Sequence, residues 1–356
     1  MAFNHPLVFA DPALNAQIAH FPSSRFMGSK NAILPFLHET FRELEFTTVL
    51  DAFNGSGAVG YLLKSMGKAV TSNDLLHFSY HTAQACIANN GTHLPDEGVQ
   101  SLLVANDLAE DFIQTTFQGL YFTDAENCWL DNVTANIRGM SNSIQQSIAY
   151  AALSRACLRR RPRGLFTYTG TRYLDGRRDI RTSLEEHFYD AVRLFNTAVF
   201  ENGQPCRAFQ GDVFALPDDD EYDLVYFDPP YVSSLSDNDY ARRYHFVEGL
   251  TRYWEGLEIQ QNTTTKKFRR IPSAFDTKRT IHAAFERLFT RYQNSIIVVS
   301  YSSNSIPTRD DLTELLQCYK RNVRVFEKNH RYSSGTHAHK VHDNQNVVQE
   351  FLFVGC

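Results

Sequence analysis

The stretch Asp223-Leu-Val-Tyr-Phe-Asp-Pro-Pro-Tyr231 carries the strongest structural signal in this chain. Four apolar or aromatic residues, Leu224 to Phe227, predict a buried strand that must end where two prolines remove backbone donors. Asp228 is therefore expected at the carboxyl edge of a strand, where ligands bind in open α/β sheets. This point of the sheet would bind an exocyclic amine on a flat base. The Asp228 carboxylate and the Pro229 carbonyl can accept the two N–H bonds of the amine, and the Tyr231 ring can stack on the base. The alternative is a strand that ends in a Pro-Pro turn with a solvated aspartate.

A second strand signal, Phe46 to Phe53, continues into the glycine-rich turn Asn54-Gly-Ser-Gly-Ala-Val-Gly60 and then into a helix. This order is typical of a crossing that binds a nucleotide cofactor, because glycines let the backbone approach the ligand. The turn also satisfies the pattern G-x-G-x-x-G, so a dinucleotide cofactor is an open alternative. Asp51, at the tip of the strand, suits the ammonium of a methionine moiety better than a pyrophosphate. Asp74 ends the next short strand, where a carboxylate can accept both ribose hydroxyls.

Two further segments are candidates for a ligand contact. Ser24-Arg-Phe-Met-Gly-Ser-Lys30 precedes a predicted helix from about residue 31 to residue 41, and a Gly-Ser-Lys turn offers N–H groups and an ammonium to a carboxylate. A solvated lysine at a helix start explains this pattern equally well. The segment Cys206 to Phe214 predicts a strand that ends in Asp212, which either meets a cofactor adenine or is a turn aspartate. Residues 1 to 23 show no clear period and predict an arm.

Residues 78 to 200 show a mostly helical pattern with no further strand–glycine–helix crossing, and we interpret them as an inserted lobe. Residues 155 to 181 contain nine arginines, no lysine and two acids, a net charge of +7 within a chain of net charge −5. Arginine forks pair with phosphates and guanine edges, and interleaved aromatic rings can stack. This composition favours a nucleic-acid partner over a solvated basic face. A second basic patch follows at residues 262 to 270.

The C-terminal part predicts a helix from Thr280 to Tyr292, a buried strand from Ser295 to Asn304, a helix over 311–319, and strands 323–326 and 347–354 that close the sheet as a hairpin. Four histidines between the last two strands lack partners at fixed spacing, and the six cysteines form no C-x-x-C pair, so we predict no metal site. The chain shows no apolar run of about 18 residues and no signal pattern, which predicts a cytoplasmic protein without a membrane partner.

Three of these motifs resemble those of the Dam-like N6-adenine DNA methyltransferases, in the order that this family uses. The segment Arg25 to Lys30 is similar to the N-terminal aromatic-x-Gly-x-Lys element, although Phe26 stands where many members have Trp or Tyr. The segment Asp51 to Gly57 is similar to the F-x-G-x-G cofactor loop, and Asp228 to Tyr231 is similar to the catalytic tetrapeptide. Residues 78 to 200 align with nothing that we can identify.

The resemblance implies an α/β fold of the S-adenosylmethionine-dependent methyltransferase type, with a seven-stranded, mostly parallel sheet, a terminal hairpin and an inserted helical lobe that recognises DNA. We expect residues 1–77 and 201–356 to form the catalytic domain, residues 78–200 the recognition lobe, and 232–275 a further DNA-contacting segment. The implied cofactor is S-adenosylmethionine and the implied substrate a flipped adenine in double-stranded DNA. A monomer and a restriction-modification role with a cognate endonuclease are family expectations.

The expected site residues fall into three groups. The catalytic candidates are Asp228, Pro229, Pro230 and Tyr231. The cofactor candidates are Phe26, Lys30, Asp51, Phe53, Asn54, Gly55, Ser56, Gly57, Asp74, Asp212, Val213 and Asp228. The DNA candidates are Arg159, Arg160, Arg161 and Arg163 on phosphates, Arg172, Arg177 and Arg178 on a hairpin that reaches a guanine edge, and Lys266, Lys267, Arg269 and Arg270 in the second patch.

Three alternatives stay open at this point. A cytosine-N4 methyltransferase uses the same scaffold but usually carries Ser in place of the first Asp of the tetrapeptide. The literal G-x-G-x-x-G from Gly55 to Gly60 also fits an NAD-dependent oxidoreductase. A catalytically silent DNA-binding protein would explain the basic stretch alone.

Overall fold

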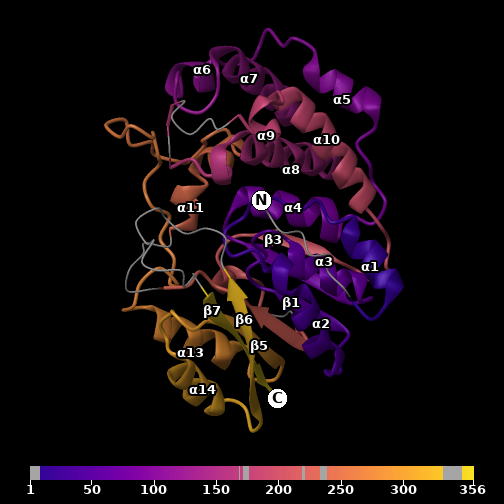
Figure 1. Ribbon diagram of the computed structural model, residues 1–356, viewed down its shortest axis with the longest axis vertical. Helices are drawn as coiled ribbons and strands as arrows, with labels where there is room; N and C mark the ends of the chain where they lie inside the picture. The colour runs from indigo at the N-terminus through magenta and orange to yellow at the C-terminus, as the bar shows by residue number, and fades with distance from the viewer. Residues whose placement is uncertain (1–8, 168, 171–175, 219–220, 233–238, 332–346) are drawn as a thin grey trace.

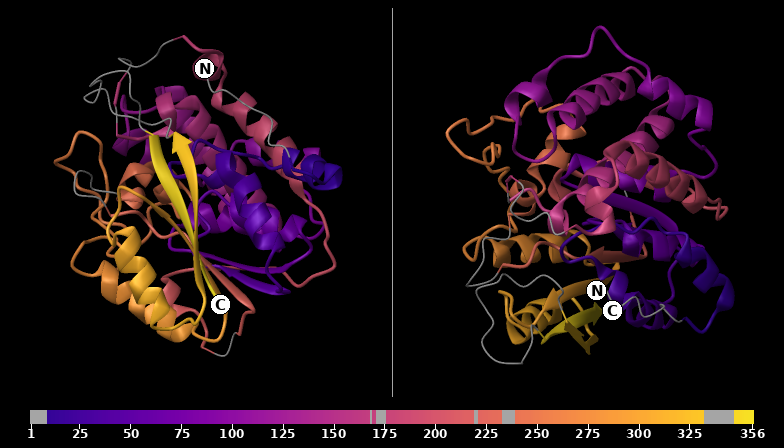
Figure 2. Two further views of the ribbon diagram at one scale, coloured as in Figure 1. Left: turned by 60° about the horizontal axis from the view of Figure 1, so that its bottom comes forward. Right: turned by 45° about the horizontal axis from the view of Figure 1, so that its top comes forward.

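The computed structural model describes residues 9–167, 169–170, 176–218, 221–232, 239–331 and 347–356. Within these residues the chain forms a seven-stranded sheet in the order β3-β2-β1-β4-β5-β7-β6 (Figure 1). The strands are β1 (Thr48–Asp51), β2 (Ala69–Asp74), β3 (Arg207–Gln210), β4 (Leu224–Phe227), β5 (Ile296–Ser302), β6 (Val323–Arg331) and β7 (Val347–Gly355). β1 to β5 pair in parallel, whereas β7 runs antiparallel to both β5 and β6, and Figure 2 shows β6 and β7 as one long pair. The predicted mostly parallel sheet with a terminal hairpin is confirmed.

The strand order gathers three acidic residues at one edge of the sheet. β1 lies between β2 and β4, and Asp51 is in register with Ser72 of β2 and with Tyr226 of β4. Asp74 is the last residue of β2, and Asp228 directly follows β4. Because parallel strands end at the same edge, the sheet brings the three carboxylates into one region.

Alternate residues of the central strands enter two apolar cores, one on each face of the sheet. In β4, Leu224 and Tyr226 enter the first core, whereas Val225 and Phe227 enter the second. The first core is covered by α1 (Pro12–Ala19), α2 (Leu34–Arg42), α3 (Ala58–Ser65) and α4 (His77–Ala83), and the second by α13 (Ile281–Arg291) and α14 (Arg309–Gln317). A strand that is buried on both faces explains the continuous apolar run in its sequence.

Between β2 and β3, the regular secondary structure of the described residues consists of helices. It contains η2 (Gln84–Ala88), α5 (Asp96–Leu103), α6 (Phe112–Thr116), α7 (Asp124–Arg138), α8 (Ser143–Arg160), η3 (Pro162–Gly164), α9 (Arg178–Arg181) and α10 (Leu184–Ala198). α5 to α10 lie together at one end of the molecule, at the top of Figure 1. Capping boxes start two of these helices, with Thr123 and Glu126 at α7 and Ser183 and Glu186 at α10. The helix α4 contacts both α8 and the strands β2 and β3, so it connects this group to the sheet.

Two local expectations differ from the structure. The predicted arm contains α1, which Asp11 caps and whose Leu14 and Ile18 are buried; two apolar anchors are too few to show a period. The helical spacing expected from 242 to 254 forms two short helices, α11 (Tyr240–Arg243) and α12 (His245–Leu250). Helix α12 ends before Tyr253 and Trp254, which adopt positive φ angles of 46° and 57°.

Candidate active site

The three sequence motifs meet in one pocket at the carboxyl edge of β1, β2 and β4. All four residues of the tetrapeptide and most of the cofactor candidates line it. The lining includes Phe26, Lys30, Asp51, Phe53, Asn54, Gly55, Ser56, Asp74, Asp228, Pro229, Pro230 and Tyr231. The side chains of Ser29 and Ser56 are in contact, with their hydroxyl oxygens 3.0 Å apart, so the Lys30 turn and the glycine turn are joined directly.

The centre of the pocket is an ion pair between Lys30 and Asp228. The Lys30 ammonium lies 2.8 Å from Oδ2 of Asp228, and the two side chains are only 6% and 16% exposed. Lys30 also donates to the Tyr231 hydroxyl at 2.8 Å, and this hydroxyl lies 3.0 Å from Oδ1 of Asp228. Burial raises the pKa of Asp228 to about 6, Lys30 lowers it, and the charge of Glu350 raises it. The carboxylate is therefore ionised and held at neutral pH, with lone pairs left to accept further N–H donors.

The third charged group of this centre, Glu350 of β7, was not predicted. Its side chain is 1% exposed, and Oε1 lies 3.3 Å from the Lys30 ammonium. The hydroxyl groups of Tyr231 and Ser300 both donate to it, Ser300 at 2.9 Å. A single acid inside the apolar run Val347 to Val354 was the available signal, since a buried charge needs a partner.

Lys30 therefore has a different setting from the one that the sequence suggested. Its ammonium was expected to meet the carboxylate of a ligand, but in the structure it faces Asp228 and Glu350 of the protein itself. Gly28 explains how the turn reaches this position, because its φ of +73° is a conformation that glycine adopts freely. The backbone carbonyl of Gly28 also accepts from the Lys30 ammonium, at 3.3 Å.

The carboxylate of Asp51 is buried in the pocket without a cation beside it. Neither of its oxygens has a hydrogen-bond partner among the described residues. Burial, with repulsion from Asp228 and Asp74, raises its pKa to about 8, and the nearby N–H groups of Phe53 and Gly60 lower it without reaching hydrogen-bond geometry. An acid with this pKa is mostly protonated at neutral pH, and an incoming ammonium would favour its ionised form whereas a phosphate would oppose it. This arrangement suits the methionine end of S-adenosylmethionine rather than a pyrophosphate.

The glycine turn forms a backbone cradle next to Asp51. Gly55 and Gly57 adopt φ angles of +53° and +82°, and a Cβ atom at Gly55 would lie 3.3 Å from the Phe26 ring. Gly60, the last residue of the literal G-x-G-x-x-G, has another reason to be glycine, because a Cβ atom there would lie 2.5 Å from Ile87. The third glycine thus reflects helix packing, and the pattern does not require a dinucleotide.

Asp74 binds the turn as well as facing the pocket. Its Oδ2 accepts from the Gly55 N–H at 2.7 Å, and its Oδ1 accepts from the Leu76 N–H at 2.9 Å. Burial raises its pKa to about 6, although both N–H groups lower it. Each oxygen keeps lone pairs for a further donor, so Asp74 can hold the turn and accept from ribose hydroxyls together.

A stack of three aromatic rings borders the pocket, and two of its residues, Tyr240 and Tyr244, were missed from the sequence. The Phe26 ring stacks on Tyr244 with centroids 5.1 Å apart and planes 7° apart, and on Tyr240 at 6.1 Å. The Tyr244 hydroxyl accepts from the Met27 N–H at 2.7 Å, and Tyr240 lines the pocket. Because Tyr240 and Tyr244 are four residues apart in a helical segment, their shared face was the usable signal.

Three cofactor candidates lie outside the residues that line the pocket. Gly57 caps α3 from the turn, and Val213 is buried in the second core. Asp212 is exposed and accepts from the Phe214 N–H at 2.9 Å, at the start of η4 (Val213–Ala215). This is the turn aspartate that the sequence left as an alternative, and no contact with a cofactor follows from its position.

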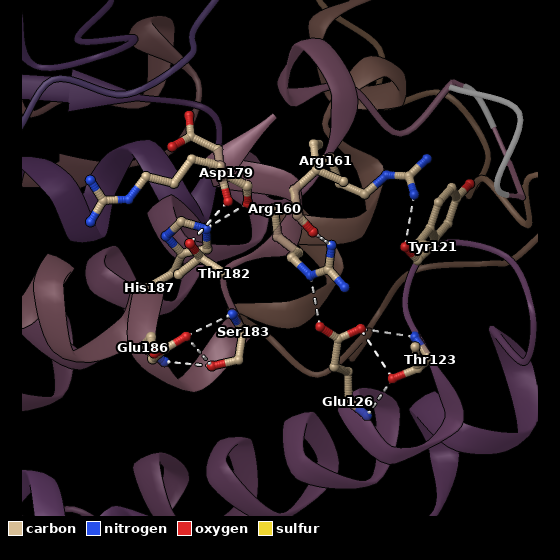
Figure 3. Close-up of polar contacts among 12 residues, drawn as sticks. Tyr121, Thr123, Glu126, Arg160, Arg161, Asp179, Thr182, Ser183, Glu186 and His187 are labelled. Carbon is tan, nitrogen blue, oxygen red and sulfur yellow. Dashed lines mark hydrogen bonds and ion pairs between the residues drawn. The ribbon is translucent and has the colours of Figure 1, made fainter. Parts of the chain in front are cut away.

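Much of the arginine-rich run has partners inside the protein (Figure 3). Arg160 pairs with Glu126 at 2.8 Å and donates to the Ile180 carbonyl, and the buried Arg161 donates to the Tyr121 carbonyl at 2.7 Å. Arg159 pairs with Asp179 at 2.8 Å. The expectation of a continuous phosphate-binding run is thus corrected at Arg160 and Arg161, because both guanidinium groups are directed to partners within the protein.

The same acid, Asp179, joins this run to the turn that carries Lys30. Arg25 pairs with it at 2.6 Å and donates to the carbonyls of Arg159 and Arg161. Arg177 and Arg178 are exposed, and α9 begins at Arg178, while most of the expected hairpin from Arg172 to Arg178 lies outside the described residues. Arg172 and the side chain of Arg163 lie outside the described residues.

The second basic patch is at the surface and partly paired. Lys266 donates to the Gln261 carbonyl at 2.5 Å, and Arg269 pairs with Glu258 at 3.1 Å, while Lys267 is half-buried. Arg270 pairs with Asp276, which lines the pocket, at 3.2 Å. This patch therefore adjoins the mouth of the pocket.

In the described ranges, no three His, Cys, Asp or Glu side chains form a group that could hold a metal ion. No helix within the same ranges is long and apolar enough to cross a membrane.

Comparisons with known proteins agree with this geometry. A family model described as D12 class N6 adenine-specific DNA methyltransferase matches residues 26–315. The chain is 29% identical over 326 residues to the Type II methyltransferase M2.HphI of Haemophilus parahaemolyticus, a match that covers 88% of this chain and 92% of that protein.

Two longer relatives match with about half of their own length. The Modification methylase StsI of Streptococcus sanguinis is 26% identical, and the Type II methyltransferase M.FokI of Planomicrobium okeanokoites is 23% identical. These matches cover 82% and 92% of this chain but only 46% and 52% of the two relatives. The family model includes the segment from Phe26 to Lys30, the glycine turn and the tetrapeptide, and it ends before Glu350. On this match, the chain belongs to the D12 class of N6 adenine-specific DNA methyltransferases.

Proposed function

We propose that this protein transfers a methyl group from S-adenosylmethionine to the N6 amine of an adenine flipped out of double-stranded DNA. The observation that carries the proposal is the buried Asp228, fixed by Lys30 and Tyr231 in the pocket that also contains the glycine turn and the unpartnered Asp51. One cavity thus contains both a hydrogen-bond acceptor for an amine, Asp228, and a binding site for a cationic cofactor at Asp51 and the glycine turn.

The residues of the chain supply orientation rather than covalent chemistry. Asp228 and the Pro229 carbonyl accept the two N–H bonds of the adenine amine, which draws the nitrogen lone pair out of the ring. The Tyr231 ring stacks on the base, because its hydroxyl is anchored at Lys30 and Glu350. After the N–C bond forms, the extra proton on N6 leaves to the Asp228 carboxylate, the nearest acceptor in this arrangement. Such positioning accounts for a large part of the rate in an in-line displacement.

The methyl donor has its own set of residues. S-adenosylmethionine, when bound, supplies an electrophilic methyl group on a sulfonium and leaves as the thioether. Asp51 would pair with its ammonium, Asp74 would accept from the ribose hydroxyls, and the turn from Asn54 to Ser56 would contact it through the backbone. Phe26 contributes an aromatic face beside the turn.

The biological setting follows from the relatives. M2.HphI and M.FokI are both named Type II methyltransferases, which supports a restriction-modification role for this chain, with DNA as the partner and a cognate endonuclease in the same system. Among the described side chains, the DNA-contacting candidates that remain at the surface are the exposed Arg177 and Arg178 and the patch from Lys266 to Arg270.

The test is expression in a host that lacks adenine methylation, followed by sequencing of its DNA with modification-sensitive reads. We expect N6-methyladenine at one recurrent sequence, and no such mark with Asp228→Ala. N4-methylcytosine in place of N6-methyladenine would support the cytosine alternative, and unmodified DNA from a folded, cofactor-binding protein would contradict the proposal.

A further inference from the structure

The carboxylate of Glu350 lies beside the Lys30–Asp228 ion pair and belongs to none of the three motifs. We propose that Glu350 is a positioning residue for methyl transfer, which holds the Lys30 ammonium and the Tyr231 hydroxyl so that Asp228 keeps its capacity to accept the adenine amine. The inference rests on the proposed role of Asp228. It assigns a function to the terminal hairpin, beyond closing the sheet, because β7 places this side chain against Lys30 and Tyr231.

The geometry shows how Glu350 shares the partners of Asp228. Lys30 lies 2.8 Å from Asp228 and 3.3 Å from Glu350, so one ammonium serves two carboxylates. The Tyr231 hydroxyl contacts both acids as well. A phenol has one hydrogen to donate, and a hydrogen directed to Glu350 leaves a lone pair on Oδ1 of Asp228 for the substrate.

Glu350 is itself held in place. Ser300 of β5 donates to its Oε1 at 2.9 Å, and β5 and β7 are adjacent strands that pair Ser302 with Glu350. The side chain is 1% exposed, so an acid is buried here in a strand whose next four residues, Phe351 to Val354, are all apolar. Burying a carboxylate costs free energy unless its partners compensate, and the partners here are two residues of the catalytic centre.

Removal of the charge at Glu350 should weaken Asp228 as an acceptor. Without the Glu350 charge, the Lys30 ammonium and the Tyr231 hydroxyl would both donate to Asp228 alone. Each of these hydrogen bonds occupies a lone pair of the carboxylate and so lowers its capacity to accept from the adenine amine. The other titratable groups near Asp228 are Asp51, Tyr226 and Tyr240, and a change at Glu350 leaves them in place. Glu350→Gln is close in shape, so it removes the charge with little change in packing.

The experiment compares Glu350→Gln, Glu350→Asp and the matched control Glu327→Gln in the full chain, with kcat, KM and the pH profile of kcat/KM as readouts. Glu327 lies on the adjacent strand β6 and pairs at the surface with Arg309, so its variant should behave as the wild type. We expect Glu350→Gln to lower kcat about 10- to 100-fold with little change in KM for S-adenosylmethionine. Since Glu350 raises the pKa of Asp228, its loss should move the acidic limb of the profile to lower pH.

The outcomes separate a positioning role from a structural one. Glu350→Asp keeps the charge but moves it back by one methylene. It should therefore have a kcat between those of Glu350→Gln and the wild type, and an acidic limb of kcat/KM close to the wild-type pH. This variant serves as the test if Glu350→Gln does not fold. A wild-type kcat in Glu350→Gln overturns the inference, as does a loss of kcat with an unmoved acidic limb. Asp228→Ala is measured in parallel: a near-normal rate there would place the failure in the assignment of Asp228, and the role of Glu350 would fall with it.

Discussion

The ammonium nitrogen of Lys30 lies 2.8 Å from Oδ2 of Asp228, and both side chains are largely buried. Through this contact the turn that precedes α2 and the tetrapeptide that follows β4 form one catalytic unit. Lys30 was expected to seat a carboxylate of the cofactor, but its position makes it the cation that keeps Asp228 ionised. Loss of either partner leaves an uncompensated buried charge, which is costly.

The first prediction concerns the charge of Lys30. Lys30→Met removes the cation that lowers the pKa of Asp228, so this pKa should rise above its present value of about 6. The acidic limb of kcat/KM should move to higher pH, opposite to the shift expected for Glu350→Gln, and the rate at neutral pH should fall by roughly 10². A pH profile of methyl transfer checks this, and an unmoved limb would show that Asp228 does not need Lys30 to stay ionised.

Asp51 gives a prediction that links stability to pH. Its pKa is raised from 3.8 to about 8 in the folded chain, so the folded state binds more protons than the unfolded state between these values. The stability contributed by protonated Asp51 is complete below the unfolded pKa and is lost as pH rises through the folded pKa. Asp51→Asn should therefore raise Tm at about pH 8, by a few degrees for each kcal/mol gained, and much less at about pH 5.

The same variant should bind S-adenosylmethionine more weakly, because the amide cannot pair with the ammonium. Thermal unfolding at the two pH values and a cofactor titration give both readouts. An Asp51→Asn protein with unchanged Tm at high pH and unchanged cofactor affinity would show that Asp51 is not an unpartnered acid reserved for the ligand.

Asp74 and Asp212 provide a matched pair of aspartates. Asp74→Ala removes the acceptor of the Gly55 N–H and the proposed acceptor of the ribose hydroxyls, so we expect the Kd for S-adenosylmethionine to rise about 10-fold or more. Asp212→Ala removes only an exposed cap of η4, and its Kd should stay within about twofold of wild type. A calorimetric titration with S-adenosylmethionine measures the Kd of both variants. A large rise in the Kd of Asp212→Ala would support the predicted contact of Asp212 with the cofactor adenine.

The arginines of the basic stretch should separate into two classes. Replacing both Arg177 and Arg178 with Ala should weaken DNA binding and flatten the slope of log affinity against log salt by about 0.9 for each lost phosphate contact. Arg161→Ala should lower Tm, since it removes the contacts with Tyr121, and leave the salt slope of the folded protein unchanged. If Arg161→Ala changes the salt slope while the double variant of Arg177 and Arg178 does not, the phosphate-binding arginines are those from Arg159 to Arg163, as the sequence predicted.

The sheet and the main motifs could be predicted because local patterns determine them. An apolar run that stops at Pro229 and Pro230 marks β4, and the glycine turn marks the start of α3. Parallel strands then necessarily bring Asp51, Asp74 and Asp228 to one edge. These inferences need only spacing and backbone chemistry.

The other features of the site depend on contacts between residues that lie far apart in the sequence, and no local pattern predicts such contacts. Glu350 reaches Lys30 only because β7 inserts between β5 and β6. Arg160 and Arg161 look like a phosphate-binding run in sequence, but Glu126 and the Tyr121 carbonyl, from another part of the chain, satisfy them. A basic run whose acids lie elsewhere in the sequence cannot be distinguished from a DNA-binding run by composition.

The central claim is that Asp228 accepts the adenine amine, and the most direct measurement is the single-turnover rate of methyl transfer from labelled S-adenosylmethionine to duplex DNA that contains the recognised sequence. Asp228→Ala should lower this rate by roughly 10² or more, with wild-type Tm and cofactor affinity within about threefold, because the residue lies at a strand edge and its loss removes the acceptor. A folded, cofactor-binding Asp228→Ala protein that methylates N6 at a near-normal rate would contradict the account.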